Sequence, residues 1–576
     1  MLLNQIFIAG LLFQLSAALF GHSHSSANLS YAPVSVSCPA QKISRAANGE
    51  ISDQEKSWLA KRHAKSDPAL RDFLKYTAKF SDEEILRSIP SNETINIGLA
   101  PSGGSFRAML TGAGQLAALD NRTAGAFEHG LGGLFQATTY LAGLSGSGWL
   151  VGSLAMSDYP SIDEILAQRE IWDLEHPFFN LDGLNVGGSM RQWHHIANEV
   201  DEKRQAGFNV SMTDYYARAL ARQLLPASND YSINVGYSSL RETGAVSDGD
   251  MPLPIIQANG RPVEQVITYQ NSTVFEMNPF EFGTWDPSGN TFVDMKYLGS
   301  TFKDGEAEKC VTNYDNAGFL IGVTSSLFDM VMDDAVMYTA KFKPLSKLLS
   351  KLFAPVMKKK EHVAIVEPNP FFQTDNGHSP NLKNAQDLFL VDGGEDQQKI
   401  PLIPLVQPKR EVDIVFAYDL GAELPHFWPG GSSLTNTYER QFLEIGEGFS
   451  VPYVPDDKTM QALNYTHKPV FFGCDARNLT SLRHTPPMIV YTANTEYTYP
   501  SNAPTYKFSF SEKDFRGHIT NGFETATRGN LTDDSEFATC VGCAVVRRSQ
   551  ERLGVEQTEQ CKQCFQRYCW DGTLVN

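Results

Sequence analysis

The sequence predicts an α/β fold, a central mixed sheet flanked by helices, with a cysteine-rich C-terminal tail. Three stretches support this prediction, because each contains a short apolar strand followed by a Gly-rich turn. They are "INIGLA" before "PSGGSFRAMLTGAGQLAAL", "QATTYLAG" before "LSGSGWLVGSLAM", and "DLFLVDGG" before "IPLIPLVQ". Elements that alternate in this way form sheets whose strand ends carry functional loops.

Composition and charge limit the function classes. The 576 residues, 42% hydrophobic and 20% charged, suffice for one very large core or for two to three domains. Neither a repeat of fixed period nor a low-complexity linker divides the body, so we expect one folding unit. The formal net charge of −18 argues against nucleic acid as a partner and provides no long-range attraction to anionic membranes.

The N-terminus predicts export. Residues 1–20 have the pattern of a signal peptide, with an apolar run from Ile6 to Phe20 and small residues near its end. The usual Lys or Arg before the run is missing, and the alternative is a buried N-terminal helix. No other run approaches the roughly eighteen apolar residues of a membrane span. The C-terminus also lacks a GPI tail. We therefore expect a secreted protein, extracellular or retained at the cell wall, without a transmembrane anchor.

Eight Asn-x-Ser/Thr sequons agree with export, because a chain in the secretory route can receive glycans at such sites. Chance alone places several sequons in a chain of this length, so only their number is suggestive. The predicted glycosylation sites are Asn28, Asn92, Asn121, Asn209, Asn271, Asn464, Asn478 and Asn530.

The cysteines predict disulfides in the tail, residues 540–576. Five of the eight cysteines lie there, and five is odd, so full pairing requires at least one bond to the body. The spacing of "CVGC" and "CKQC" also matches a zinc ribbon. Disulfides are favoured in an exported chain, because thiolates oxidise there. The cysteines are Cys38, Cys310, Cys474, Cys540, Cys543, Cys561, Cys564 and Cys569.

The stretch "GLSGS" predicts a nucleophile elbow within the α/β fold. Ser145 follows a strand and opens a helix, and its glycine neighbours allow the sharp turn that exposes a serine hydroxyl above a sheet. Ser147 stands where the strict G-x-S-x-G pattern has glycine, and it has no glycine two positions before it. A Ser/Gly loop without chemistry is the alternative.

A second Gly-rich turn, "SGGSFRAM", could hold an oxyanion. The backbone N–H groups of Gly103, Gly104 and Ser105 precede a helix, and the positive end of its dipole lies behind them. Arg107 adds a permanent positive charge one turn later. The alternative is a tight turn with Arg107 in solvent. Because the GK[ST] ending is absent, the turn is not a nucleotide-binding P-loop.

The residues alone leave the general base open. Asp392, in "LFLVDGGED", ends an apolar strand beside two glycines, although aspartate at such a boundary is often only a turn former. The usual hydrolase order instead places a histidine after the serine. The eligible histidines are His426, His467, His484 and His518.

The motifs "SGGSFRAM", "GLSGSGW" and "VDGGE", in this order, resemble those of cytosolic phospholipase A2 and the fungal phospholipase B (lysophospholipase) family. The resemblance extends from Cys38 into the tail and implies a catalytic domain over residues 38–539. It implies a Ser/Asp dyad without histidine: Ser145 as nucleophile and Asp392 as base. By the same resemblance, Arg107 stabilises the substrate, and Gly103–Ser105 form the oxyanion hole.

The resemblance implies an enzyme that hydrolyses phospholipid and lysophospholipid esters through an acyl-enzyme. Such an enzyme would contact the lipid interface transiently and would need neither a metal nor an organic cofactor. Asp392 with an ordinary pKa of about 3.9 can take the proton only as the hydroxyl attacks. An enzyme with this carboxylate as its base would keep its activity well below pH 6, whereas an enzyme with a histidine base would lose it. The chain departs from the family in "AYDLGAELPHFWPGGSSL", at Leu420, Leu424, Phe427 and Gly430. This departure affects the expected lining of the substrate pocket rather than the dyad.

Residues 344–360 form a basic amphipathic segment. Apolar residues recur at helical spacing from Leu345 to Val356, with Lys347, Lys351 and Lys358–Lys360 beside or beyond them. A surface helix packed on the core is favoured over a lid or interfacial helix. Two rival functions remain: a serine ester hydrolase with a Ser-His-Asp triad, and a lipid-binding or adhesion protein that has lost catalysis.

Overall fold

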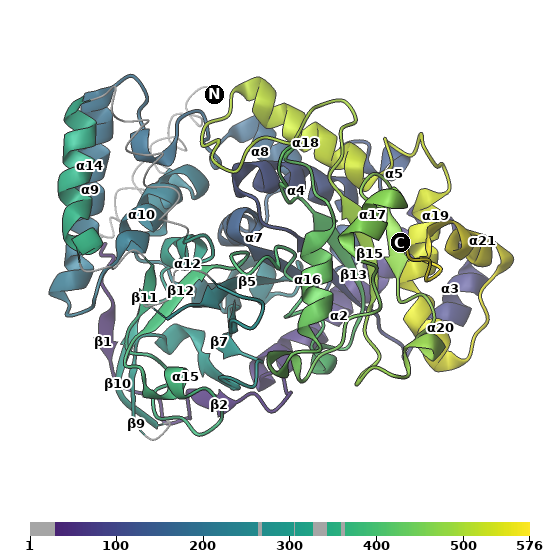
Figure 1. Ribbon diagram of the computed structural model, residues 1–576, viewed down its shortest axis with the longest axis horizontal. Coiled ribbons are helices and arrows are strands. Elements are labelled where there is room, and N and C mark those ends of the chain that lie inside the picture. The colour runs from purple at the N-terminus through teal and green to yellow at the C-terminus, as the bar shows by residue number, and fades with distance from the viewer. Residues whose placement is uncertain (1–28, 263–267, 304–305, 327–342, 359–362, 576) are drawn as a thin grey trace, which may run out of the picture.

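The computed structural model describes residues 29–262, 268–303, 306–326, 343–358 and 363–575 (Figure 1). The predicted signal peptide and Asn28 lie outside the described residues. Among the described helices, none is both long enough and apolar enough to span a membrane.

A twelve-stranded mixed sheet forms the centre of the fold, as predicted. Its main path runs β14-β15-β13-β3-β4-β5-β6-β7-β8-β2. Neighbouring strands from β15 to β5 are parallel, and the rest pair antiparallel. The parallel strands are β3 (Asn96–Pro101), β4 (Tyr140–Leu144), β5 (Leu253–Gly260), β13 (Val412–Asp419) and β15 (Met488–Ala493). The others are β2 (Ser44–Ala46), β6 (Val274–Met277), β7 (Glu281–Thr284), β8 (Thr291–Asp294), β11 (Ala364–Val366), β12 (Leu388–Asp392) and β14 (Val470–Phe472).

Strand β5 brings the ends of β4 and β12 together. Its first five residues pair with β4, up to Leu144 opposite Gln257, and its last three pair with β12, where Asp392 is opposite Ala258. The other edge of β5 pairs with β6, so β4 and β12 share one edge. Because β12 runs antiparallel to β5, the C-terminal ends of β4 and β12 meet. Distant segments of the chain thus become neighbours.

Helices cover the sheet, and glycines allow two of them to approach closely. Helix α4 (Ser105–Leu119) is buried throughout and packs under α18 (Glu512–Ala526) (Figure 1). A Cβ on Gly114 would lie 1.9 Å from the carbonyl oxygen of Ile519, and one on Gly522 would lie 2.0 Å from that of Thr111. Larger residues at either position would force the helices apart.

The remaining helices and the second sheet complete the fold. A three-stranded sheet contains β1 (Val34–Val36), β10 (Glu306–Thr312) and β9 (Thr301–Lys303). The other described α-helices are α2 (Asp53–Asp72), α3 (Asp82–Ser88), α5 (Ala126–His129), α6 (Leu134–Ala137), α7 (Ser145–Met156), α8 (Ile162–Gln168), α9 (Val186–Gln205), α10 (Met212–Leu224), α11 (Gly244–Ser247), α12 (Ala317–Val323), α14 (Lys343–Lys358), α15 (Pro380–Asn384), α16 (Ser432–Arg440), α17 (Asp457–Ala462), α19 (Phe537–Val545), α20 (Arg547–Leu553) and α21 (Glu559–Tyr568).

The basic amphipathic segment is a helix packed on the body. Helix α14 lies beside α9 at one end of the molecule (Figure 1). The ring of Phe353 contacts Trp193 and Tyr215, with centroids 5.5 and 5.9 Å apart, and the apolar face is buried. Lys347 and Lys351 are exposed. This is the favoured interpretation of the segment; Lys359 and Lys360 lie outside the described residues.

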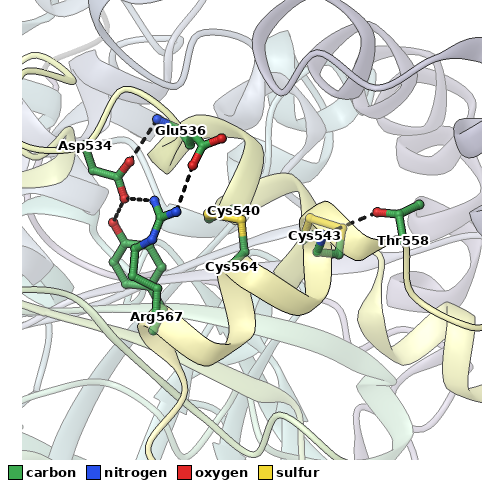
Figure 2. The surroundings of a disulfide bond; sticks show 9 residues. Asp534, Glu536, Cys540, Cys543, Thr558, Cys564 and Arg567 are labelled. Carbon is green, nitrogen blue, oxygen red and sulfur yellow. Dashed lines mark hydrogen bonds and ion pairs between the residues drawn. A yellow bond between two sulfur atoms is a disulfide. The ribbon is translucent and has the colours of Figure 1, made fainter.

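All eight cysteines form disulfides, which confirms the favoured interpretation of the tail and rules out thiolate zinc ligands. Two bonds join α19 to α21, and Arg567 of α21 also pairs with Asp534 and Glu536 (Figure 2). A third ties the tail to the body, as the odd count requires. The pairs are Cys38–Cys310, Cys474–Cys569, Cys540–Cys564 and Cys543–Cys561. The division into catalytic domain and tail stays a prediction.

Candidate active site

Ser145 occupies a strained turn between β4 and α7. Its φ is +51°, a left-handed conformation that is uncommon for residues other than glycine and that concentrates at functional sites. Gly146 is required behind it, because a Cβ there would lie 2.0 Å from the carbonyl oxygen of Ser105. Ser145 is 8% exposed. This is the geometry of a nucleophile elbow.

Ser147 has a structural role instead. Its hydroxyl accepts a hydrogen bond from the Leu144 N–H and donates one to the Leu144 carbonyl, both 2.9 Å long. The side chain is fully buried. Ser147 therefore closes the first turn of α7 and points away from solvent.

Asp392 lies at the end of β12, buried beside Ser145. Burial raises the pKa of this carboxyl to about 6, and the nearby Ser145 hydroxyl opposes that rise. Oδ1 accepts a hydrogen bond of 2.7 Å from the Gly394 N–H. Oδ2 makes no hydrogen bond of normal geometry with any described residue. A catalytic hydrogen bond that is loose in the free enzyme can tighten when substrate binds.

The loop after α12, which the sequence motifs do not include, holds the Ser145 and Asp392 turns together. One carbonyl, that of Thr324, accepts hydrogen bonds from Ser145 N at 3.0 Å and from Gly393 N at 3.1 Å. The Ser326 carbonyl accepts a third from Asp392 N at 3.3 Å. No motif marks these residues, because they act through backbone carbonyls.

The Gly-rich turn before α4 lies directly against the elbow. A Cβ on Gly103 would lie 2.9 Å from the Ser145 Cβ. The Gly103 N–H already donates to the Lys399 carbonyl at 2.8 Å. The N–H groups of Gly104 and Ser105 make no hydrogen bond within the described part of the chain. Of the three predicted oxyanion donors, two are therefore free.

Arg107 faces the same turn from inside α4. A Cβ on Gly104, whose φ is +148°, would lie 2.3 Å from the Arg107 Nη2, so only glycine fits there. The guanidinium donates to the carbonyls of Leu420 at 3.1 and 3.2 Å and of Ala503 at 2.5 Å. Burial lowers the pKa of Arg107 to about 10, and Asp419 opposes this. Arg107 thus remains charged at neutral pH.

None of the eligible histidines is hydrogen-bonded to the dyad residues in the described structure. His426, His467 and His484 are exposed. His518 is buried on α18, where its Nδ1 is 2.8 Å from the Asp514 carbonyl. Burial lowers the pKa of His518 to about 4, so it is neutral at ordinary pH.

The segment that departs from the family lies beside Arg107. Leu420 is buried and supplies a carbonyl to Arg107. Leu424 is 81% exposed. The ring of Phe427 contacts that of Tyr506, with centroids 6.5 Å apart. Gly430 is tightly enclosed, because a Cβ there would lie 2.1 Å from the Glu423 Oε2. Of these four residues, Leu420 is the one that contacts Arg107.

A strained serine between strand and helix, next to a buried carboxyl at the edge of an α/β sheet, has the architecture of a serine hydrolase. The family model of the lysophospholipase catalytic domain matches residues 97–575. Lysophospholipase 3 of Saccharomyces cerevisiae is 44% identical, over 98% of this chain and 85% of the relative. A lysophospholipase of Torulaspora delbrueckii is 45% identical, over 95% and 86%.

This chain therefore belongs to the lysophospholipase family, and the recognition and enzyme class predicted from the motifs are confirmed. Human GIVD cytosolic phospholipase A2 has a similar structure, with a TM-score of 0.62 at 17% identity. The match covers 89% of this chain and 67% of that chain. It confirms the fold class.

Proposed function

We propose that this chain is a secreted phospholipase B/lysophospholipase that cleaves fatty-acyl esters of glycerophospholipids and lysophospholipids with a Ser/Asp dyad. The observation that carries the proposal is the strained Ser145 beside the buried Asp392. No described histidine is hydrogen-bonded to either residue, so the structure favours the dyad over a Ser-His-Asp triad. The intact constellation likewise argues against a binding protein without catalysis.

The mechanism has two halves. Ser145 Oγ attacks the ester carbonyl while Asp392 takes its proton, and the free N–H groups of Gly104 and Ser105 stabilise the oxyanion. Arg107, held against the same turn, supports that negative charge. The glycerol oxygen leaves with the proton from Asp392, and acyl-Ser145 remains. Water then attacks the acyl group with Asp392 as base, releasing fatty acid and free Ser145.

Three features support secretion and glycosylation. The N-terminal pattern is that of a signal peptide, and the four disulfides suit an oxidising compartment. Of the described sequon asparagines, Asn530 is half-buried. The other described ones are exposed, as glycan attachment requires: Asn92, Asn121, Asn209, Asn271, Asn464 and Asn478.

Product analysis tests the proposed function. Purified protein incubated with acyl-labelled lysophosphatidylcholine should release labelled fatty acid and glycerophosphocholine in equal amounts. An acid quench during turnover should leave label on the peptide that contains Ser145, because the acyl group passes through that oxygen. Folded protein that releases no fatty acid from lysophosphatidylcholine or phosphatidylcholine would refute the proposal.

The raised pKa of Asp392 changes the expected pH dependence. The base must be ionised to accept a proton, so kcat/KM should be constant above pH 7 and fall about tenfold per unit well below pH 6. The activity well below pH 6 that we predict from the sequence alone depends instead on an ordinary pKa for this carboxyl. A soluble short-chain lysophospholipid assayed from pH 4 to 9, with folding followed by circular dichroism, measures the profile.

A matched variant identifies the titrating group. Asp396 is a buried neighbour whose charge raises the pKa of Asp392, so Asp396→Asn should move the acid limb to lower pH. Single replacement of His426, His467, His484 or His518 should keep at least a tenth of the activity and leave the limb in place. A limb that disappears with one of these histidines would contradict the dyad.

A further inference from the structure

Lys399 lies where the Gly-rich turn and the Asp392 turn meet. Its carbonyl accepts the Gly103 N–H at 2.8 Å, and Gly103 packs against Ser145. On the other side, a Cβ on Gly394 would lie 3.2 Å from the Lys399 Cγ, so the side-chain stem crosses the backbone just after Asp392. The backbone of Lys399 is thus part of the site, and its side chain extends from there.

The ammonium of Lys399 has no ion-pair partner in the described part of the chain. The residue is half-buried. Its charge lowers the pKa of both Asp392 and Asp419, each of which burial raises. Asp392 is the last residue of β12 and Asp419 is the last residue of β13. The charge of the ammonium therefore acts on the ends of two strands at the site. An ammonium has three N–H donors, and a partly desolvated one favours an anionic acceptor.

Two other cations around the site, both in the described part of the chain, are engaged. Arg107 is buried and donates to two backbone carbonyls, and Arg261 pairs with Glu395, in the loop after Asp392, at 2.6 Å. In a chain with a net charge of −18, a local cation is needed to attract an anionic group. Lys399 meets this need next to the predicted nucleophile.

We propose that Lys399 binds the phosphate diester of the lipid substrate and thereby positions the fatty-acyl ester at Ser145. This inference rests on the proposed function and names the group that recognises the headgroup. In a lysophospholipid only the glycerol unit separates the phosphate from the ester. A cation on the loop that follows Asp392 can hold the phosphate while the ester carbonyl occupies the oxyanion turn.

Two substrates that differ only in the phosphate test the proposal. Lys399→Met should raise KM for a monomeric lysophosphatidylcholine about tenfold or more, as expected for loss of a charge-assisted contact. Above about pH 8, where Asp392 is ionised with or without Lys399, kcat/KM of the variant for the 1-monoacylglycerol of the same chain length should change less than about twofold, because that ester has no phosphate. Lys399→Arg should restore most of the binding. Lys347→Met, on the exposed face of α14, is the control and should alter neither substrate.

Other results would overturn the proposal in recognisable ways. Equal losses with both substrates above about pH 8, where Asp392 is ionised, would show that Lys399 acts on the dyad residues instead of on the phosphate. Unchanged kinetics with both substrates would show that Lys399 has no role in binding or catalysis. Inhibition of monoacylglycerol hydrolysis by inorganic phosphate as strong as that by glycerophosphocholine would assign the site to free phosphate. Wild-type protein that hydrolyses neither ester would refute the proposed function rather than this inference.

Discussion

Replacing Ser145 by alanine is expected to lower kcat/KM for lysophospholipid by about 10⁴-fold or more, as for other serine hydrolases that lose their nucleophile. The fold should be unaffected, because alanine keeps the Cβ and no other described residue depends on the hydroxyl for a normal hydrogen bond. Binding of substrate should persist, since the oxyanion turn and Arg107 are untouched. Steady-state kinetics, with circular dichroism to verify folding, measure the effect.

Ser147→Ala is the matched control in the same turn. It removes two buried hydrogen bonds to Leu144, so the free energy of unfolding should fall by about 1–3 kcal/mol. The protein should nevertheless keep at least a tenth of its activity. A fluorophosphonate probe should label Ser145, assigned by fragment mass spectrometry. Label on Ser147, or inactivity of a folded Ser147→Ala protein, would reverse the assignment.

Asp392→Asn should lower kcat/KM by about 10³-fold or more between about pH 7 and 9, where the wild-type carboxylate is ionised, because asparagine cannot accept the serine proton. The amide oxygen can still accept the Gly394 N–H, so the turn should remain. Steady-state assays across this range measure the loss. A tenth or more of the wild-type activity between about pH 7 and 9 would show that another residue is the base.

The same variant should be more stable than the wild type above pH 6. Burial raises the pKa of Asp392 to about 6, so the folded state holds the proton more tightly than the unfolded state. The stability from that protonation is present at low pH and is lost as pH rises through about 6. At pH 8 Asp392→Asn should gain about 3 kcal/mol in the free energy of unfolding, and near pH 4 little. Denaturant unfolding at both pH values tests this, and equal effects would contradict a buried charge.

The sequence by itself predicts the α/β sheet and the turn at Ser145, because both depend on local residues. Apolar strands interrupted by glycines specify short elements with sharp connections. The positive φ of Ser145 follows from small neighbours such as Gly146, which allow two backbones to approach closely. The three motifs, in their order along the chain, also identify the family.

Only the tertiary structure decides how these turns work together. Asp392 meets Ser145 because β4 and β12 pair with the same edge of β5 from opposite directions, although β12 begins at Leu388, 244 positions after Leu144 ends β4. No local pattern encodes such pairing. The raised pKa of Asp392, the engaged Gly103 N–H, the disulfide partners and the placement of Lys399 likewise arise from contacts between distant segments. Burial and hydrogen bonding are properties of the packed chain, so a sequence read residue by residue does not contain them.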